Sequence, residues 1–396
     1  MDLTKLRAWW AHKQGLDAPA AAAAPADVLA RTGWARSVGG ANPYFQLFSR
    51  AGIGRAEADE AVAGLAIHEL PTARGCTYVL PAADYAVGLK VGEHAPLADV
   101  ATCAKLGVPR AEIDKLAERV VAALEASAGP LDPRQLKDVL GDAVRNLGEA
   151  GKKKGVSTTL PVALGLLQAA GEIRRVPVNG RIDQQKYSYV RWSPPGPSLD
   201  LAAARAELAR RYWSWTGGAS LAHFRWFSAL TVKDAAAAVE PLGLVPLDDD
   251  LLALPEDAKA YADFTPPPAP SYTLVAWLDG LTLLRRDLTS VLDPADAERA
   301  LPAVLSKKRL GELADLPAQG IFDRGRLAGL WEYDVDEGAI AWAAFGPADD
   351  ALRAAVARTE EFTRDQLGDA KGSSQDNPSR RKPRIDAIRE LADLTA

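Results

Sequence analysis

The segment Ser157–Trp192 reads STTLPVALGLLQAAGEIRRVPVNGRIDQQKYSYVRW, and the fold prediction rests on it. Its first part, to about Ala170, is largely apolar and predicts a helix. Ser157 is the expected N-cap, and Pro161 is tolerated in a first helical turn. Two runs of alternating apolar residues follow, and Asn179-Gly180 between them predicts a β-hairpin. A helix followed directly by a hairpin is the second half of a winged helix.

The same order of short helices and then a hairpin is predicted on both sides of this segment. Helical spacing and turn residues repeat along the first two thirds of the chain, and the Pro-rich stretch Thr265–Pro270 marks a boundary. We therefore expect an α+β protein whose first part contains three tandem winged-helix units, at residues 1–91, 92–198 and 199–270.

The remainder of the chain has a different pattern. Short alternating runs at Ile321-Phe322, Leu327–Glu332 and Ala339–Phe345 predict strands separated by turns. We expect residues 271–370 to form a C-terminal β-rich, barrel-like domain. Residues 371–396 are expected to be a basic tail that is loose as far as Arg384 and ends in a short helix.

Composition limits the function classes. The chain has 396 residues, 48% of them hydrophobic, and a net charge of -5, so it is not a polycation that coats nucleic acid everywhere. Two cysteines and four scattered histidines form no zinc signature, and no metal or organic cofactor is expected. The first residues lack the long apolar core of a signal peptide, and no apolar run is long enough to span a membrane, so neither feature is expected. A cytoplasmic monomer is expected.

Basic residues cluster around the segment quoted above. Lysines neutralise phosphates, and the N-terminus of a helix offers free N–H groups to them, so the cluster predicts contact with double-stranded DNA. A solubilising charged face is the alternative. The expected DNA-binding residues are Lys152, Lys153, Lys154, Ser157, Thr158, Thr159, Arg174, Arg175, Arg181 and Lys186, with Arg36 and Arg74 as further candidates.

Three motifs resemble those of the tandem winged-helix DNA glycosylases, the family of alkylpurine and interstrand-crosslink repair glycosylases. Arg74–Asp84 is similar to the family's Arg-Gly-Thr-Leu-His-Leu-Val-Pro-Ala-x-Asp stretch. Ala206–Leu230 is similar to the segment that ends in Asp-Phe-x-Trp-Trp-x-Gly-Leu, and Gly320–Trp331 to the C-terminal Asp-Gly-x-x-x-Gly-x-Trp motif. The three motifs follow one another in the family's order.

The resemblance implies a monofunctional DNA glycosylase, which hydrolyses the N-glycosidic bond of an alkylated or bulky purine in lesion-containing duplex DNA. Members carry a Gln-x-Gln or Gln-x-Asp pair before the helix whose last Arg matches Arg50. Counted back from Arg50, those positions hold Arg36 and Val38. With a gap, Asn42 is the nearest residue with the required chemistry.

Base excision passes through a cation-like sugar, and a carboxamide such as that of Asn42 can orient the attacking water. The alternative is that Asn42 only turns the chain before Pro43. His68 is a second candidate base, or else a residue at a helix end.

Whether the chain is an enzyme stays open at this stage. Without the Gln pair, it could be a non-catalytic winged-helix DNA-binding protein that reads damage or regulates. A protein-interaction module that uses the acidic surface is a third reading.

Overall fold

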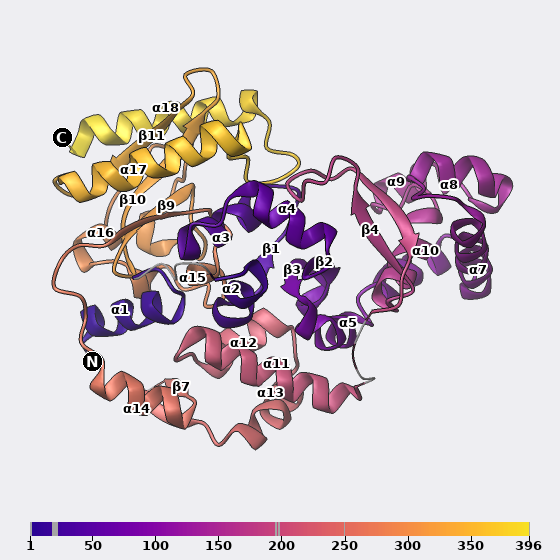
Figure 1. The fold of residues 1–396 in the computed structure, drawn as a ribbon, viewed down its shortest axis with the longest axis horizontal. Coiled ribbons are helices and arrows are strands. Elements are labelled where there is room, and N and C mark those ends of the chain that lie inside the picture. The colour runs from indigo at the N-terminus through magenta and orange to yellow at the C-terminus, as the bar shows by residue number, and fades with distance from the viewer. Residues whose placement is uncertain (1, 18–22, 195, 197–198, 249, 396) are drawn as a thin grey trace.

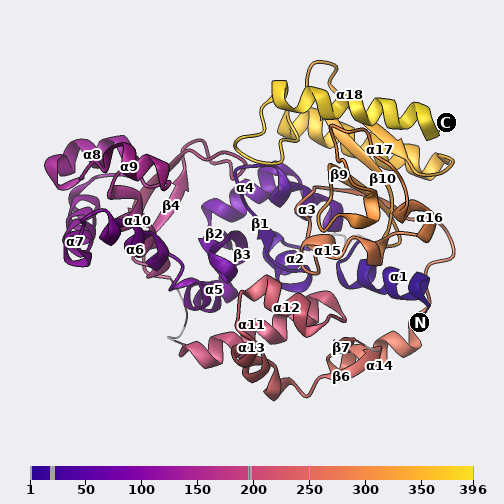
Figure 2. The same cartoon turned by 180° about the vertical axis from the view of Figure 1, so that it is seen from behind.

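The computed structural model describes residues 2–17, 23–194, 196, 199–248 and 250–395. Figure 1 shows an elongated molecule, with the lobe of α7 to α10 at one end and the C-terminal sheet under α17 and α18 at the other. Seen from behind, α11 to α14 run along one long edge (Figure 2). None of the described helices is long and apolar enough to cross a lipid bilayer.

The first unit is built around a three-stranded antiparallel sheet of order β1-β3-β2. Its elements are α1 (Leu3–Lys13), α2 (Pro25–Thr32), β1 (Ala35–Arg36), α3 (Asn42–Ala51), α4 (Arg55–Ala63), β2 (Ile67–Pro71) and β3 (Thr77–Pro81). From α2 onward the order is helix, strand, helix, helix, hairpin. The connection between β2 and β3 includes Arg74, whose φ of 59° is left-handed.

The second unit contains the predicted hairpin, and β4 and β5 confirm it as an antiparallel pair. Leu131 forms a single β-bridge with Tyr189 and so adds a short third strand to the hairpin. The basic stretch Lys152–Lys154, expected in a loop, instead lies largely in a short helix. The elements are α5 (Tyr85–Gly92), α6 (Leu97–Lys105), α7 (Arg110–Ala126), α8 (Pro133–Leu140), α9 (Gly148–Lys153), α10 (Leu160–Ala169), β4 (Ile173–Pro177) and β5 (Tyr187–Arg191).

The third unit again runs helix, bridge, helix, helix, hairpin, because Ala219 forms a β-bridge with Leu252. Its elements are α11 (Leu201–Thr216), α12 (Leu221–Ser228), α13 (Val232–Val239), β6 (Val245–Asp248), β7 (Leu251–Ala253) and the following α14 (Pro255–Asp263). Side chains N-cap the first three helices of the unit: Asp200 caps α11, Ser220 caps α12 and Thr231 caps α13.

The C-terminal part is a four-stranded antiparallel sheet of order β11-β10-β9-β8. The expected barrel is not closed: among the described strands, β8 and β11 are the two ends of an open sheet. Its elements are β8 (Tyr272–Val275), α15 (Gly280–Leu283), α16 (Pro294–Ala297), β9 (Gln319–Asp323), β10 (Arg326–Asp334), β11 (Ala339–Ala344), α17 (Asp350–Phe362) and α18 (Pro378–Thr395). Short turns of 3₁₀ helix lie at Ala73–Gly75, Ala82–Asp84, Gly141–Ala143, Glu240–Leu242, Thr289–Val291 and Leu310–Glu312, and α17 continues as a π-helix at Thr363–Leu367.

The tail is not loose. Helix α18 begins seven residues before the expected Ile385, packs on β10 and β11, and includes Pro383. It buries Ile385, Ile388 and Leu391 in the same core as Trp10 of α1. The two ends of the chain therefore meet at the C-terminal sheet, and α1 packs there although it was assigned to the first unit.

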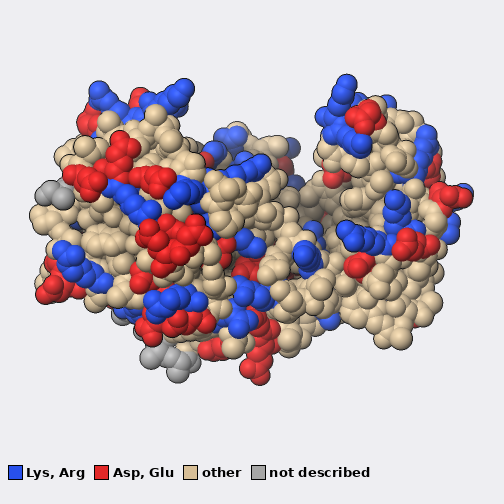
Figure 3. Space-filling view, turned by 90° about the horizontal axis from the view of Figure 1, so that it is seen from above, with Lys and Arg blue, Asp and Glu red and all other residues tan. Residues whose placement is uncertain are grey.

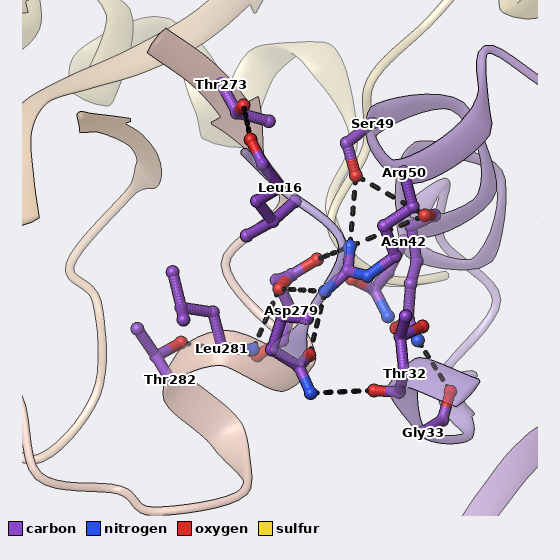
Figure 4. Close-up of polar contacts among 12 residues, drawn as sticks. Leu16, Thr32, Gly33, Asn42, Ser49, Arg50, Thr273, Asp279, Leu281 and Thr282 are labelled. Carbon is purple, nitrogen blue, oxygen red and sulfur yellow. Dashed lines mark hydrogen bonds and ion pairs between the residues drawn. The ribbon is translucent and has the colours of Figure 1, made fainter. Parts of the chain in front are cut away.

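A buried ion pair joins the first unit to the C-terminal part (Figure 4). Arg50 at the end of α3 donates two hydrogen bonds to Asp279, each 2.8 Å long, and both side chains are fully buried. Gln14 accepts a third bond from Arg50 and donates to the carbonyl groups of Thr32 and Trp215. This network fixes α3, and with it the loop that precedes α3.

Candidate functional site

The loop between β1 and α3, residues 36–42, holds the positions at which a catalytic pair was expected. Arg36 donates to the carbonyl oxygen of Thr77 at 2.6 Å, and its guanidinium lies 5.4 Å from the ring centre of Tyr78. Asn42 is 1% exposed, and its Nδ2 donates to the carbonyl of Arg36 at 2.8 Å. The Asn42 side chain therefore ties the two ends of the loop together.

A segment near the C-terminus covers this loop. The backbone N–H of Ala41 donates to the carbonyl of Lys371 at 2.9 Å, and that of Ser374 donates to the carbonyl of Val38 at 3.0 Å. A Cβ at Gly40 would overlap the backbone of Gly372, so only glycine allows this approach. Gly39 and Gly40 thus serve close packing within the protein.

A buried carboxylate lies beside the same loop. Glu69 on β2 is 5% exposed, and its Oε1 accepts from the hydroxyl groups of Ser37 and Tyr187, the latter at 3.2 Å. Its Oε2 lies 3.6 Å from Arg175 Nη1 but receives no hydrogen bond from the described residues. The cluster joins the loop, the hairpin β2–β3 of the first unit and the hairpin β4–β5 of the second.

The charges in this cluster affect one another. Burial, and then the negative charge of Glu69, raises the pKa of Tyr187, which keeps its hydroxyl protonated as a donor. Burial opposes the charge of Arg175, but the adjacent Glu69 raises the pKa of Arg175 above its ordinary value. An ionised carboxylate with one oxygen free can accept a proton or stabilise a nearby positive charge.

Sequence reasoning missed Glu69. A charged residue at an inward position of the apolar run Ile67–Pro71 was the available signal. Its partner Tyr187 lies 118 residues further along the chain, so no local pattern pairs them.

His68 points to the opposite face of β2 and lies within a strand, not at a helix end as expected. It is 1% exposed, packed against the rings of Tyr85 and Trp192. Burial, with a smaller contribution from the charges of Arg174 and Arg175, lowers its pKa to about 3. A neutral ring with no hydrogen-bond partner among the described residues is a packing residue rather than a base.

A cleft of about 550 Å³ separates the first unit from the second. Among the expected DNA-binding residues, it brings together Thr158 and Arg175. Arg134 and Lys137 on α8 also line it, and sequence reasoning missed both. Their spacing of three residues on a helix, which places both on one face, was the signal that could have found them.

The other residues expected around α10 are dispersed. Lys152 pairs with Glu149 at 2.7 Å, while Lys153, Lys154 and Ser157 are exposed. Ser157 is not the N-cap: Thr159 occupies that position, is buried, and accepts a hydrogen bond from Arg145 N through its hydroxyl instead of capping α10.

On and after the hairpin, the basic residues have different surroundings. Arg181 is bound to Asp183 and to the carbonyl of Leu367, Arg174 is half-buried, and Lys186 is exposed. On the first unit, Arg74 is exposed, with its guanidinium 4.4 Å from the ring centre of Trp226. In the view from above, Lys and Arg stand on both sides of the recess between the lobe and the larger body, while acidic side chains gather on the body (Figure 3).

Comparison with known families decides the classification. A family model described as DNA glycosylase AlkZ-like matches residues 29–361. The chain belongs to this family. The solved structure of Streptomyces sahachiroi DNA glycosylase AlkZ has the same fold, with a TM-score of 0.69 and 17% sequence identity over 94% of this chain and 98% of that chain. No sequence among the curated proteins matches the chain.

Within this AlkZ-like chain, the loop 36–42 and Glu69 both fall inside the matched residues, whereas α18 and the covering segment 371–376 lie beyond them. At the two positions expected for the family's Gln pair, Arg36 donates to the carbonyl of Thr77, and the carbonyl of Val38 accepts from the backbone N–H of Ser374.

Proposed function

We propose that the chain is a monofunctional DNA glycosylase that hydrolyses the N-glycosidic bond of alkylated or bulky purines in duplex DNA. The observation that carries this proposal is the carboxylate of Glu69, buried beside the loop 36–42 with Oε2 free of a hydrogen-bond donor, in a member of a DNA glycosylase family.

Glu69 supplies what the reaction needs. Departure of the base leaves positive charge on the sugar, which a carboxylate stabilises, and the same oxygen can take a proton from the attacking water. Ser37 and Tyr187 hold Oε1, so the carboxylate keeps one orientation. Asn42 then acts as a positioning residue that maintains the loop rather than as the water-orienting group.

Arg175 connects this carboxylate to the cleft. It lies against Glu69 Oε2 and also lines the cleft between the first two units. A DNA phosphate bound in the cleft would compete with Glu69 for the guanidinium, because charge-assisted bonds from Arg to phosphate are strong. DNA binding would thereby release the carboxylate for the reaction.

We propose that the three units, 1–91, 92–198 and 199–270, are winged helices that present this cleft to DNA, a reading that their repeated order of elements favours. Arg36 and Arg181 are already engaged in contacts within the protein, so they are not expected to bind phosphate. The main phosphate-binding groups are then the exposed Lys153, Lys154 and Lys186, together with Arg134, Lys137 and Arg175. Arg74 and Arg174 contribute at the edges of this surface.

The test is a base-release assay on duplexes carrying 7-alkylpurines or an interstrand crosslink. Glu69→Gln preserves the size of the side chain and removes its charge, so we expect excision to slow by about 10²–10⁴-fold, the usual contribution of a general base, while DNA affinity is kept. Glu57→Gln, which removes an exposed carboxylate from the same unit, is the matched control. Full activity of Glu69→Gln would refute the role of Glu69.

A second function, a non-catalytic reader of DNA damage, is favoured by one observation: Arg36 and Val38 stand where the family's Gln pair belongs. Neither side chain can orient water as a carboxamide does. This alternative predicts that the wild-type chain binds lesion-containing duplexes but generates no abasic sites on any of them.

A further inference from the structure

A second cavity, of about 290 Å³, lies between the C-terminal sheet and the residues that lead into α18. Trp277, the apolar stretch 316–318 and Glu332 form one side, while Gly372, Asp376 and Arg384 are on the other. Figure 1 shows the chain between α17 and α18 passing beside α3 and α4 before it enters α18. The segment that covers the loop 36–42 therefore also forms a wall of this cavity.

Glu332 is the polar group of the cavity with the most unusual environment. Its side chain is 3% exposed, and burial raises its pKa. Arg384 Nε donates to its Oε1 at 3.0 Å, and no described residue donates to Oε2. A carboxylate at a cavity wall that has one oxygen without a protein donor favours a ligand that brings N–H groups to it.

The rest of the lining selects a flat ligand. Trp277 is partly exposed, and its Nε1 donates to the carbonyl of Gly372 at 3.3 Å, which fixes the indole ring. Aromatic rings of this kind stack on nucleobases. Asp376 and Glu332 both pair with Arg384, and the exposed Arg380 also lines the cavity. Its volume of about 290 Å³ is at the small end of the range for ligand pockets and is sufficient for a purine ring system.

We propose that this cavity binds a guanine-type purine base, with the N1–H and 2-amino groups donating to Glu332 and the ring lying against Trp277. The choice of base rests on the proposed glycosylase function, in which a 7-alkylguanine leaves the DNA. The cavity then holds the base on the far side of the segment 371–376 from the loop 36–42.

Calorimetric titration of the full chain with 7-methylguanine tests this directly, without DNA. We expect saturable binding at one site, and 7-methylhypoxanthine, which lacks only the 2-amino group, should bind about tenfold more weakly because one hydrogen bond to a charged group is lost. Glu332→Gln places an amide donor opposite the ligand's donors and should weaken binding by at least about tenfold. Trp277→Ala, a partly exposed position, should weaken it by a similar factor through loss of stacking.

Glu337→Gln is the matched control, because it removes an exposed carboxylate that pairs with Arg389 just beyond the end of β10. It should bind 7-methylguanine as the wild type does. Absence of saturable binding by the wild type, or equal binding by all variants, overturns the proposal. The two proposals can be refuted independently. If the wild type releases bases from DNA but does not bind 7-methylguanine, the proposed role of the cavity is wrong. If it binds 7-methylguanine but releases no base, the proposed glycosylase function is wrong.

Discussion

Two neighbouring residues on β2 show how burial acts on charge. Glu69 is surrounded by hydroxyl donors and Arg175, whereas His68, one residue earlier, faces aromatic rings and stays neutral. Strand alternation sends the two side chains to opposite faces, so adjacent positions have opposite electrostatic environments. The sequence could identify both residues as unusual in an apolar run, but it could not say which of them has partners.

His68 makes stability depend on pH. Its pKa falls from 6.5 to about 3 on folding, so the unfolded chain binds a proton below about pH 6.5 and the folded chain does not. The free energy of unfolding should therefore decrease as the pH falls, by about 1.4 kcal/mol between pH 7.5 and 5.5 from this residue. Urea unfolding at several pH values measures the effect.

His68→Phe keeps a ring in the aromatic cluster and should remove this part of the pH dependence. His94→Gln, at a side chain that is 65% exposed, should leave it unchanged. An identical pH dependence in His68→Phe and the wild type would contradict the assignment.

At the scale of elements, the sequence predicted the helices and hairpins that are determined by interactions between residues close together in the chain. Alternating runs on either side of Asn179-Gly180 predicted the hairpin β4–β5, although its strands are joined by the longer loop 178–186, in which Asn179-Gly180 forms only an early turn. The β-branched and aromatic run that ends at Pro81 predicted β3, the second strand of the hairpin β2–β3. Helix α18 was missed over its first half because basic residues and Pro383 disfavour an isolated helix there. It forms because Ile385, Ile388 and Leu391 bury themselves against the sheet, a contact that no local pattern encodes.

The covering segment 371–376 packs closely against the loop 36–42, and this packing depends on the absence of a side chain at Gly40. Gly40→Ala would place a methyl group on the backbone of Gly372, which no side-chain movement relieves. We expect destabilisation of about 1–3 kcal/mol, typical of overpacking, and faster proteolysis between residues 370 and 377. Limited proteolysis with mass spectrometry and thermal unfolding measure the two effects.

Gly346→Ala is the control, because its added Cβ meets nothing within 4 Å. It should alter neither the proteolytic pattern nor the stability by more than about 0.5 kcal/mol. Equal protection of residues 370–377 in both variants would show that the segment does not depend on close approach at Gly40.

For the whole molecule, the pair of Arg50 and Asp279 links distant parts of the chain. Arg50→Met leaves a buried carboxylate without its cation and should cost about 3–5 kcal/mol in the free energy of unfolding. Asp279→Asn should also lower the free energy of unfolding. The double variant should lose less of that free energy than the two single variants lose together, because neither charge is then left buried without its partner. Strict additivity in denaturant unfolding would exclude a direct interaction.

The arrangement of the units also determines how the chain meets DNA. Because the net charge of the chain is -5, we expect DNA affinity to come from the local basic surface on the second unit, where Lys153 and Lys154 are exposed. Binding to a duplex should weaken as salt rises, and the double variant Lys153→Ala/Lys154→Ala should reduce the slope of log K against log salt by about 2, because each phosphate contact contributes about 0.9.

Lys307→Ala/Lys308→Ala removes the same charge from an exposed part of the C-terminal half and should leave that slope unchanged. Equal reductions in both double variants would mean that net charge, rather than the second unit, governs binding. A wild-type affinity independent of salt would exclude a phosphate-dominated mode and favour a protein-interaction module. A reduced slope in Lys153→Ala/Lys154→Ala alone would locate the duplex along the lobe beside Arg134 and Arg175, within reach of the cleft that leads to Glu69.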